Sequence, residues 1–231
     1  VTMGTLASTL GLNLAWSLVA IIFGNLIGAL FMAFHSAQGP QLGVPQMIQS
    51  RAQFGVIGAV LPLILVIVMY IGYFASNSVL AGQTLGYFNI PITPAIIIAN
   101  IVMLVVCIFG YDLIHFVERW VSILFIIVFA FVTYFAIKVP LPAGALNLGP
   151  VDPGKLLLAI SIYVTWQLTY APYVADYSRY LPSTTKTSTT FWATYGGTVV
   201  GACWMMIIGA ILAAKLPGFV NNPPEGILQV W

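Results

Sequence analysis

Charged residues are scarce in this 231-residue sequence. It contains only seven lysines and arginines and five aspartates and glutamates, so charged residues make up 5% of the chain. A soluble domain has about a quarter of its residues charged, because its surface faces water. Hydrophobic residues make up 61% of the chain. We therefore infer that lipid is the solvent for most of the surface.

Cysteine and histidine are also scarce, which argues against several kinds of site. Cys107 and Cys203 lie in apolar segments, and their spacing indicates neither a disulfide framework nor a metal site. His35 and His115 lack ligand-spaced partners, whereas an enzyme within the membrane needs a nucleophile–base pair or a metal cluster at one depth. The net charge of +2 comes without a basic run, so nucleic-acid binding is not indicated. We expect a protein that is not an enzyme and needs no cofactor.

Long apolar segments fill most of the chain. The hydrocarbon core of a bilayer needs about 20 mostly apolar residues per helix, and by this measure the sequence predicts six spans. They cover residues 14–34, 58–85, 94–109, 117–137, 156–173 and 190–214. Residues 1–10 resemble the last turns of a preceding helix. Because backbone groups must pair inside lipid, the expected fold class is an all-α polytopic membrane protein.

The ends of the sequence suggest a piece of a longer chain. It opens on Val1 without a start methionine, and it stops at Trp231 shortly after the segment Asn221-Asn222-Pro223-Pro224. We therefore expect one incomplete transmembrane domain over residues 1–231.

Basic residues divide unevenly between the two ends of the predicted helices. If the loop after the first span is cytoplasmic, that side collects Arg51, Arg119, Arg179 and Lys186. The opposite side keeps Lys138, Lys155 and Lys215. Cytoplasmic loops carry an excess of lysine and arginine, so this orientation is favoured. We expect a multi-pass protein of the plasma (inner) membrane.

Glycine pairs and charged pairs give further expectations. Gly24 with Gly28, and Gly197 with Gly201, form G-x-x-x-G faces that allow helices to approach closely, although glycine is common in membrane helices anyway. Two groups of charged residues have the helical spacing of local ion pairs, and a proton relay is the alternative for the first group. These groups are Asp112, His115, Glu118 and Arg119, and Asp176 with Arg179.

Polar uncharged side chains gather in two of the spans. Tyr73 and Asn77 are one turn apart and therefore lie on one helix face. Residues 165–170 have the sequence TWQLTY, and Pro172 follows them. That proline removes a backbone donor and clashes with the carbonyl of Leu168, which weakens the helix there. Broken helices at mid-depth form the binding sites of transporters, and the alternative is a structural hydrogen-bond cluster with an aromatic belt.

The residue types at this depth favour a neutral, planar ligand. Aromatic faces stack on flat heterocycles, and the amides of Asn77 and Gln167 offer both donors and acceptors to the edge of a base. No carboxylate or arginine lies at the same depth in the predicted spans to neutralise a charged ligand.

Two segments resemble one known family. Residues 43–55 read GVPQMIQSRAQFG and resemble the loop after the second helix of the nucleobase:cation symporter-1 family. Residues 171–182 read APYVADYSRYLP and resemble the end of that family's sixth helix. Both are most similar to the purine–cytosine permease branch. The resemblance covers the whole chain, from the end of helix one through helix seven to the approach to helix eight.

The resemblance implies a fold and a site. The fold would be part of a five-plus-five inverted repeat of the leucine-transporter type, with substrate between broken helices one and six. The helix-three aromatic residue and the polar residue four positions later correspond to Tyr73 and Asn77. The helix-six contacts correspond to Trp166, Gln167 and Tyr170. Hydantoin transporters carry tryptophan at the helix-three position, so Tyr73 departs from that branch.

The function expected from this resemblance is cation-coupled uptake of a nucleobase, cytosine or purine, by alternating access. The coupling cation would be H⁺ or Na⁺, at a site formed by early helix one and helix eight, outside this chain. One alternative is transport of another neutral heterocycle, such as hydantoin, allantoin or a vitamin-like compound. A membrane-embedded enzyme or a channel would be a different class. The expected partners are the small-molecule substrate and the bilayer, and the oligomeric state is left open.

Overall fold

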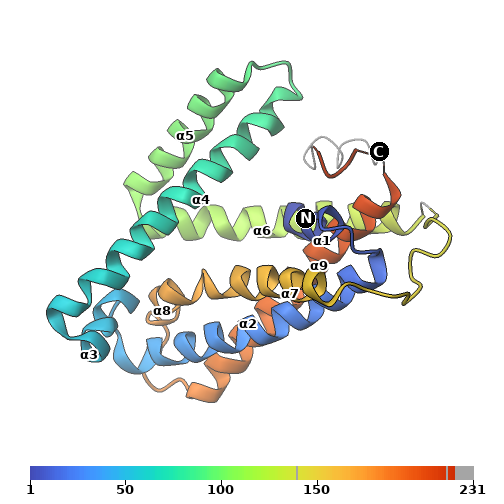
Figure 1. The fold of residues 1–231 in the computed structure, drawn as a ribbon. Coiled ribbons are helices and arrows are strands. Elements are labelled where there is room, and N and C mark those ends of the chain that lie inside the picture. Colours follow the sequence, from blue (N-terminus) through green and yellow to red (C-terminus); the bar gives the residue numbers. More distant parts are fainter. Residues whose placement is uncertain (139, 217, 222–231) are drawn as a thin grey trace.

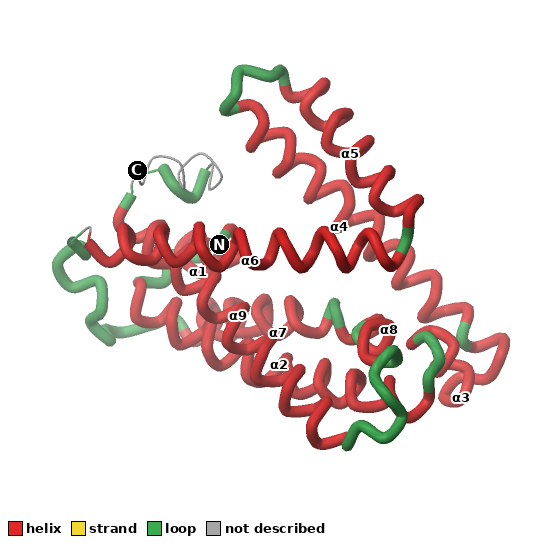
Figure 2. Tube along the Cα trace, turned by 180° about the vertical axis from the view of Figure 1, so that it is seen from behind, coloured by secondary structure: helices red, strands yellow, loops and turns green. Residues whose placement is uncertain are grey.

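The computed structural model describes residues 1–138, 140–216 and 218–221 (Figure 1). Within these residues the chain is built from helices and loops, without a strand (Figure 2). The predicted fold class, an all-α polytopic membrane protein, is therefore confirmed. The predicted approach to an eighth helix falls on residues 222–231, which lie outside the described part.

The elements follow one another in a simple order. They are η1 (Thr2–Thr5), α1 (Leu6–Thr9), α2 (Leu14–Leu42), α3 (Gln46–Gly58), α4 (Val60–Gly86), α5 (Ile92–Phe109), α6 (Tyr111–Lys138), α7 (Pro153–Leu168), η2 (Ala171–Tyr173), α8 (Ala175–Ser178) and α9 (Thr187–Lys215). Among the described residues, five of these helices are long and apolar enough to cross a membrane: α2, α4, α5, α6 and α9. They correspond to five of the six predicted spans.

The remaining predicted span, residues 156–173, is not one continuous helix. Helix α7 begins earlier, at Pro153, because the Asp152 carboxylate caps it by accepting a 2.8 Å hydrogen bond from the Gly154 amide. It ends at Leu168, and the chain continues through η2 into the short helix α8. Pro172 has no amide hydrogen to donate to the Leu168 carbonyl, which is the physical reason for the break.

Helix α2 is the central element. It packs along both α7 and α9 (Figures 1 and 2). A Cβ atom on Gly24 would lie 2.5 Å from Tyr163 Cβ, and one on Gly28 would lie 2.6 Å from the Val164 carbonyl oxygen. The predicted close approach at this glycine pair is therefore confirmed.

The second glycine pair behaves differently. Neither Gly197 nor Gly201 has a described atom within 4 Å of the place where its Cβ would be. The expected close packing at this pair is therefore absent from the described part of the chain. Here the alternative explanation applies, that glycine is simply common in membrane helices.

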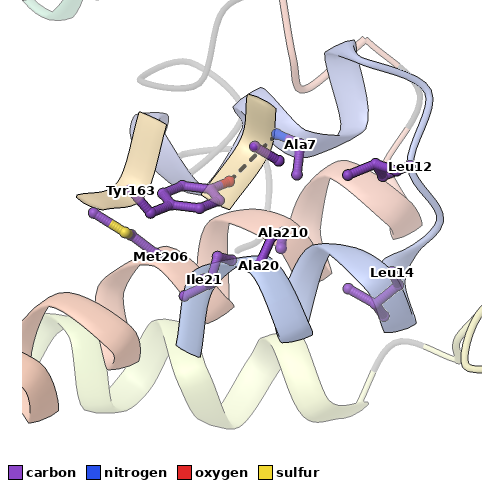
Figure 3. Close-up of a cluster of buried hydrophobic side chains, with 9 residues drawn as sticks. Ala7, Leu12, Leu14, Ala20, Ile21, Tyr163, Met206 and Ala210 are labelled. Carbon is purple, nitrogen blue, oxygen red and sulfur yellow. Dashed lines mark hydrogen bonds between the residues drawn. The ribbon is translucent and has the colours of Figure 1, made fainter. Parts of the chain in front are cut away.

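A buried cluster joins the N-terminal segment to the α2, α7 and α9 group. Tyr163 of α7 is fully buried, and its hydroxyl accepts a 3.3 Å hydrogen bond from the Ala7 amide (Figure 3). Ile21 of α2 and Met206 of α9 pack in the same cluster. The tyrosine hydroxyl thus satisfies a backbone donor that the apolar surroundings would otherwise leave unpaired.

Helices α4 and α5 form a hairpin that extends away from α2, α7 and α9 (Figure 1). The hydroxyl of Ser78 donates a 2.8 Å hydrogen bond to Asn100 Oδ1 and links the two helices. In the most apolar 18-residue segment of α5, only 6% is buried, whereas 50% is buried in the corresponding segment of α2. Helix α6 lies between the hairpin and the central group, and it packs on α9 through Val132 and Ala136.

Candidate binding site

A cavity of about 570 Å³ opens where α7 breaks. Its walls come from α2, α4, the end of α7, η2 and α9. The lining residues are Met32, Tyr73, Asn77, Trp166, Gln167, Thr169, Tyr170, Tyr173, Thr198 and Ala202. All five residues predicted from the sequence are in this set: Tyr73, Asn77, Trp166, Gln167 and Tyr170. The structure therefore brings them together around one space, and their contact with a substrate stays a prediction.

Gln167 lies in the last turn of α7 and is only 3% exposed. Its Nε2 donates a 2.8 Å hydrogen bond to Asn25 Oδ1 of α2, and Asn25 Nδ2 donates to the Ile21 carbonyl at 2.8 Å. The amide donor that the sequence assigned to a base edge is thus already engaged within the protein. Gln167 holds the end of α7 against α2 and sets the position of the cavity wall.

Tyr73 connects α4 to the break. Its hydroxyl donates a 2.9 Å hydrogen bond to Thr169 Oγ1, and the Thr169 hydroxyl donates to the Trp166 carbonyl at 2.8 Å. The Tyr73 and Trp166 rings meet edge to face with centroids 6.3 Å apart. Two aromatic rings from different helices therefore line neighbouring parts of the cavity, and they offer ring surface on which a flat ligand can stack.

Asn77 brings a side-chain amide to the cavity wall. Within the described residues, its side-chain amide takes part in no hydrogen bond. An amide of this kind offers two donors and one acceptor, the set needed to bind the edge of a nucleobase. None of the residues described as lining the cavity is charged. The chemistry of the walls therefore suits a small, neutral, planar ligand.

Five lining residues were not among the predicted substrate contacts: Met32, Thr169, Tyr173, Thr198 and Ala202. Of these, Thr169 lies in the polar segment 165–170 that the sequence singles out. Tyr173 could have been found, since it follows Pro172 directly at the predicted break. Thr198 and Ala202 are one turn apart and place small side chains on one face of α9. Met32 carries no sequence signal, because it resembles any other apolar residue of α2.

The predicted ion pairs form only in part. His115 Nδ1 lies 3.2 Å from Glu118 Oε2. The predicted side-chain pair of Asp176 and Arg179 is wrong, because Asp176 Oδ1 instead accepts a 2.7 Å hydrogen bond from the Gln46 amide. Arg179 Nε donates to the Asp176 backbone carbonyl at 3.3 Å. The Asp176 carboxylate is favourable beside Gln46, the first residue of α3, because it faces unpaired amides and the positive end of that helix.

Metal binding has no geometric basis in the described part of the chain. No group of three or more histidine, cysteine, aspartate or glutamate side chains there is arranged to hold a metal ion. The ionisable side chains of His115 and Glu118, which approach each other, lie at the start of α6 and are partly exposed.

Comparisons with known proteins identify the family. A family model described as a permease for cytosine/purines, uracil, thiamine, allantoin matches residues 1–231. The chain belongs to this permease family. The resemblance stated for residues 43–55 and 171–182, to the nucleobase:cation symporter-1 family, is thereby confirmed. The family consists of permeases, so the chain is part of a multi-pass membrane protein and not an enzyme.

Similar proteins carry related descriptions. A protein of Bacillus subtilis (strain 168) described as a purine-cytosine permease is 53% identical over 229 residues, which are 99% of this chain and 50% of that protein. A purine-cytosine permease of Saccharomyces cerevisiae is 30% identical over 212 residues, 90% of this chain and 40% of that protein. A vitamin B6 transporter of Saccharomyces cerevisiae is 27% identical over 213 residues, 88% of this chain and 37% of that protein. The chain thus spans at most about half the length of these relatives. No solved structure is significantly similar to it.

Proposed function

We propose that this chain forms part of the substrate pathway of a permease that takes up a nucleobase, cytosine or a purine, together with a cation. The observation that carries the proposal is the uncharged cavity at the break between α7 and η2, lined by aromatic rings and the unpaired amide of Asn77. Aromatic walls provide stacking surface, and the amide provides recognition of a base edge. The descriptions of the family and of its purine-cytosine permeases support the same substrate class.

Transport by this site would proceed by alternating access. Substrate binds at the helix break, the cavity closes toward one side of the membrane and then opens toward the other. The coupling cation, H⁺ or Na⁺, would bind at a site formed by segments outside this chain. Within this proposal, residues 1–231 form the end of helix one through helix seven and the approach to helix eight. We place the protein in the plasma (inner) membrane.

A second candidate is a different neutral heterocycle. The relative described as a vitamin B6 transporter favours it, because it matches 88% of this chain. A pyridine ring would stack on the same aromatic walls, and its ring substituents would meet Asn77. Competition between nucleobases and such compounds distinguishes the two candidates.

The test is uptake of tritiated cytosine and adenine by the full-length protein, in cells that lack their own nucleobase permeases. Unlabelled adenine, uracil, hydantoin and pyridoxine serve as competitors. We expect Asn77→Ala to raise KM by about 5- to 150-fold, because a lost hydrogen bond to a ligand costs about 1–3 kcal/mol. Ser76→Ala is the matched control, since Ser76 on the same helix bonds only the Gly72 carbonyl in the described structure.

Two outcomes would contradict the proposal. If no nucleobase is taken up or competes, the substrate class is wrong. If Asn77→Ala leaves KM as Ser76→Ala does, the cavity at the break is not the binding site.

A further inference from the structure

A second cavity of about 240 Å³ lies beside the first one. Five tyrosines line it: Tyr70, Tyr111, Tyr173, Tyr177 and Tyr180. Tyr173 also lines the first cavity and is the lining residue that the two spaces share. We propose that the second cavity is a weaker binding subsite for the same planar heterocycle, and that Tyr173 is the gate between the two. The inference rests on the proposed function.

Helix α4 contributes to both cavities at adjacent turns. Tyr73 lines the first cavity and Tyr70 lines the second. Three residues of helix correspond to a rise of about 4.5 Å, close to the distance between stacked rings. The Tyr70 and Tyr173 rings have centroids 5.2 Å apart. A flat ligand that leaves Tyr73 thus meets the next aromatic face one turn farther along the same helix.

The broken helix repeats this arrangement on the opposite wall. Tyr170, at the end of α7, lies 4.3 Å from Tyr173 between ring centroids, and it stacks on Tyr177 of α8 at 5.8 Å with an interplanar angle of 27°. Tyr170 lines the first cavity and Tyr177 the second. Aromatic rings therefore continue from one cavity to the other along both walls, with Tyr173 between them.

The gate position lies in the short link between two helices. Tyr173 ends the three-residue element η2, between the end of α7 and the start of α8. Pro172 removes one backbone hydrogen bond from this link, so its residues are held by fewer bonds than those of a continuous helix. A change in the Tyr173 side-chain rotamer, or a small shift of this link, would open the wall.

The second cavity binds more weakly by its chemistry. Its charged groups already have protein partners: the Asp176 carboxylate bonds the Gln46 amide, and Arg179 donates to the Tyr180 hydroxyl at 2.7 Å while stacking on that ring. No unpaired amide comparable to Asn77 lines it. Five of its nine lining residues are tyrosines, so stacking on ring faces is its main contribution to ligand binding. Without a hydrogen bond like that to Asn77, the expected affinity is about 5- to 150-fold lower than in the first cavity.

The location of the second cavity gives it a direction. It lies at the end of the molecule that holds α3 and α8, whereas the N-terminus lies at the opposite end (Figure 1). That end carries Arg51, Arg179 and Lys186, on the side predicted to be cytoplasmic. The subsite would therefore hold the heterocycle after it leaves the first cavity and before its release into the cytoplasm.

The test measures equilibrium binding of tritiated cytosine, and of tritiated adenine in parallel, to the full-length protein in detergent. We expect a tight and a weak class of site. Asn77→Ala removes the tight class, whereas Tyr111→Ala removes the weak class and leaves the tight dissociation constant within twofold. Tyr111→Phe keeps both, because stacking needs only the ring. Tyr134→Ala is the control on the same helix, since Tyr134 contacts Lys138 and not the cavity.

Transport adds an independent readout. Tyr111→Ala and Tyr177→Ala should each lower kcat for uptake several-fold with KM little changed, because release is slowed. The proposed subsite would be overturned if the wild-type protein shows only the tight class of site. It would also be overturned if the weak class survives in both Tyr111→Ala and Tyr177→Ala. Absence of the tight class, or its persistence in Asn77→Ala, would instead refute the proposed function.

Discussion

Replacing Gly28 by alanine tests the close approach of α2 and α7. The new Cβ would lie 2.6 Å from the Val164 carbonyl oxygen and 2.8 Å from Gln167 Cβ. Carbon contacts are favourable at about 3.5–4.0 Å, so the two helices must separate by about 1 Å. A backbone oxygen and a Cβ atom form this contact, and neither moves when a side chain changes rotamer.

The expected energies have opposite signs at the two glycine pairs. Overpacking costs about 1–3 kcal/mol, while replacing glycine by alanine within a helix returns about 0.5–1 kcal/mol. Gly28→Ala should therefore be net destabilising. At Gly201 no described atom lies within 4 Å of the added methyl group, so only the favourable helix term remains. The two variants should differ by about 1–3 kcal/mol.

Thermal unfolding of the purified full-length protein in detergent measures this difference. A change of 1 kcal/mol shifts Tm by roughly 2–4 °C in a protein of 150–250 residues, and the shift is smaller in a longer chain. Gly28→Ala should therefore melt below Gly201→Ala by about one to a few degrees. Gly28→Ala should also weaken nucleobase binding, because Gln167 is one of the displaced neighbours. If Gly28→Ala melts at or above Gly201→Ala, the described contact between α2 and α7 is wrong.

Two further substitutions test single hydrogen bonds. Asn25→Ala leaves the buried Gln167 donor without its acceptor, and the cost of about 1–3 kcal/mol should lower Tm. Combining Asn25→Ala with Gln167→Leu should partly restore Tm, because the unpaired donor is then removed as well. An unchanged Tm in the single variant would refute the buried pair. Asp176→Asn removes a charge worth about 0.3–1 kcal/mol at the start of α3. Amide hydrogen exchange at Gln46 should then become faster, and equal exchange in both proteins would show that the carboxylate does not cap this helix.

Much of the fold could be predicted from local signals. Five of the spans follow from apolar segments of sufficient length, because each helix satisfies its own backbone in lipid. The break after Leu168 follows from Pro172, since the proline acts on the carbonyl four residues before it. Tyr73 and Asn77 share a face by helical periodicity alone, and the structure places both at one cavity.

Features that depend on contacts distant in sequence could not be predicted. Gly28 and Gly201 have the same local motif, and only the neighbouring helix decides which of them is crowded. Asp176 has Arg179 three residues away, yet its carboxylate bonds the Gln46 amide, 130 residues distant. The sequence predicts a ligand contact for Gln167, because nothing near it in sequence reveals its buried partner Asn25 on α2. Sequence spacing describes a helix face and does not describe what packs on it.

The break has a mechanical consequence through α2. Ahead of the break, Gln167 is bonded to Asn25; after it, the Ser178 hydroxyl donates a 2.7 Å hydrogen bond to the Ser36 carbonyl. Both attachments are buried and both are on α2, which therefore spans the discontinuity as a rigid brace. The two halves of the broken helix should consequently travel with α2 as one body, and widening the cavity requires α4 to slide relative to that body. Such a motion would break the hydrogen bond from the Tyr73 hydroxyl to Thr169 Oγ1.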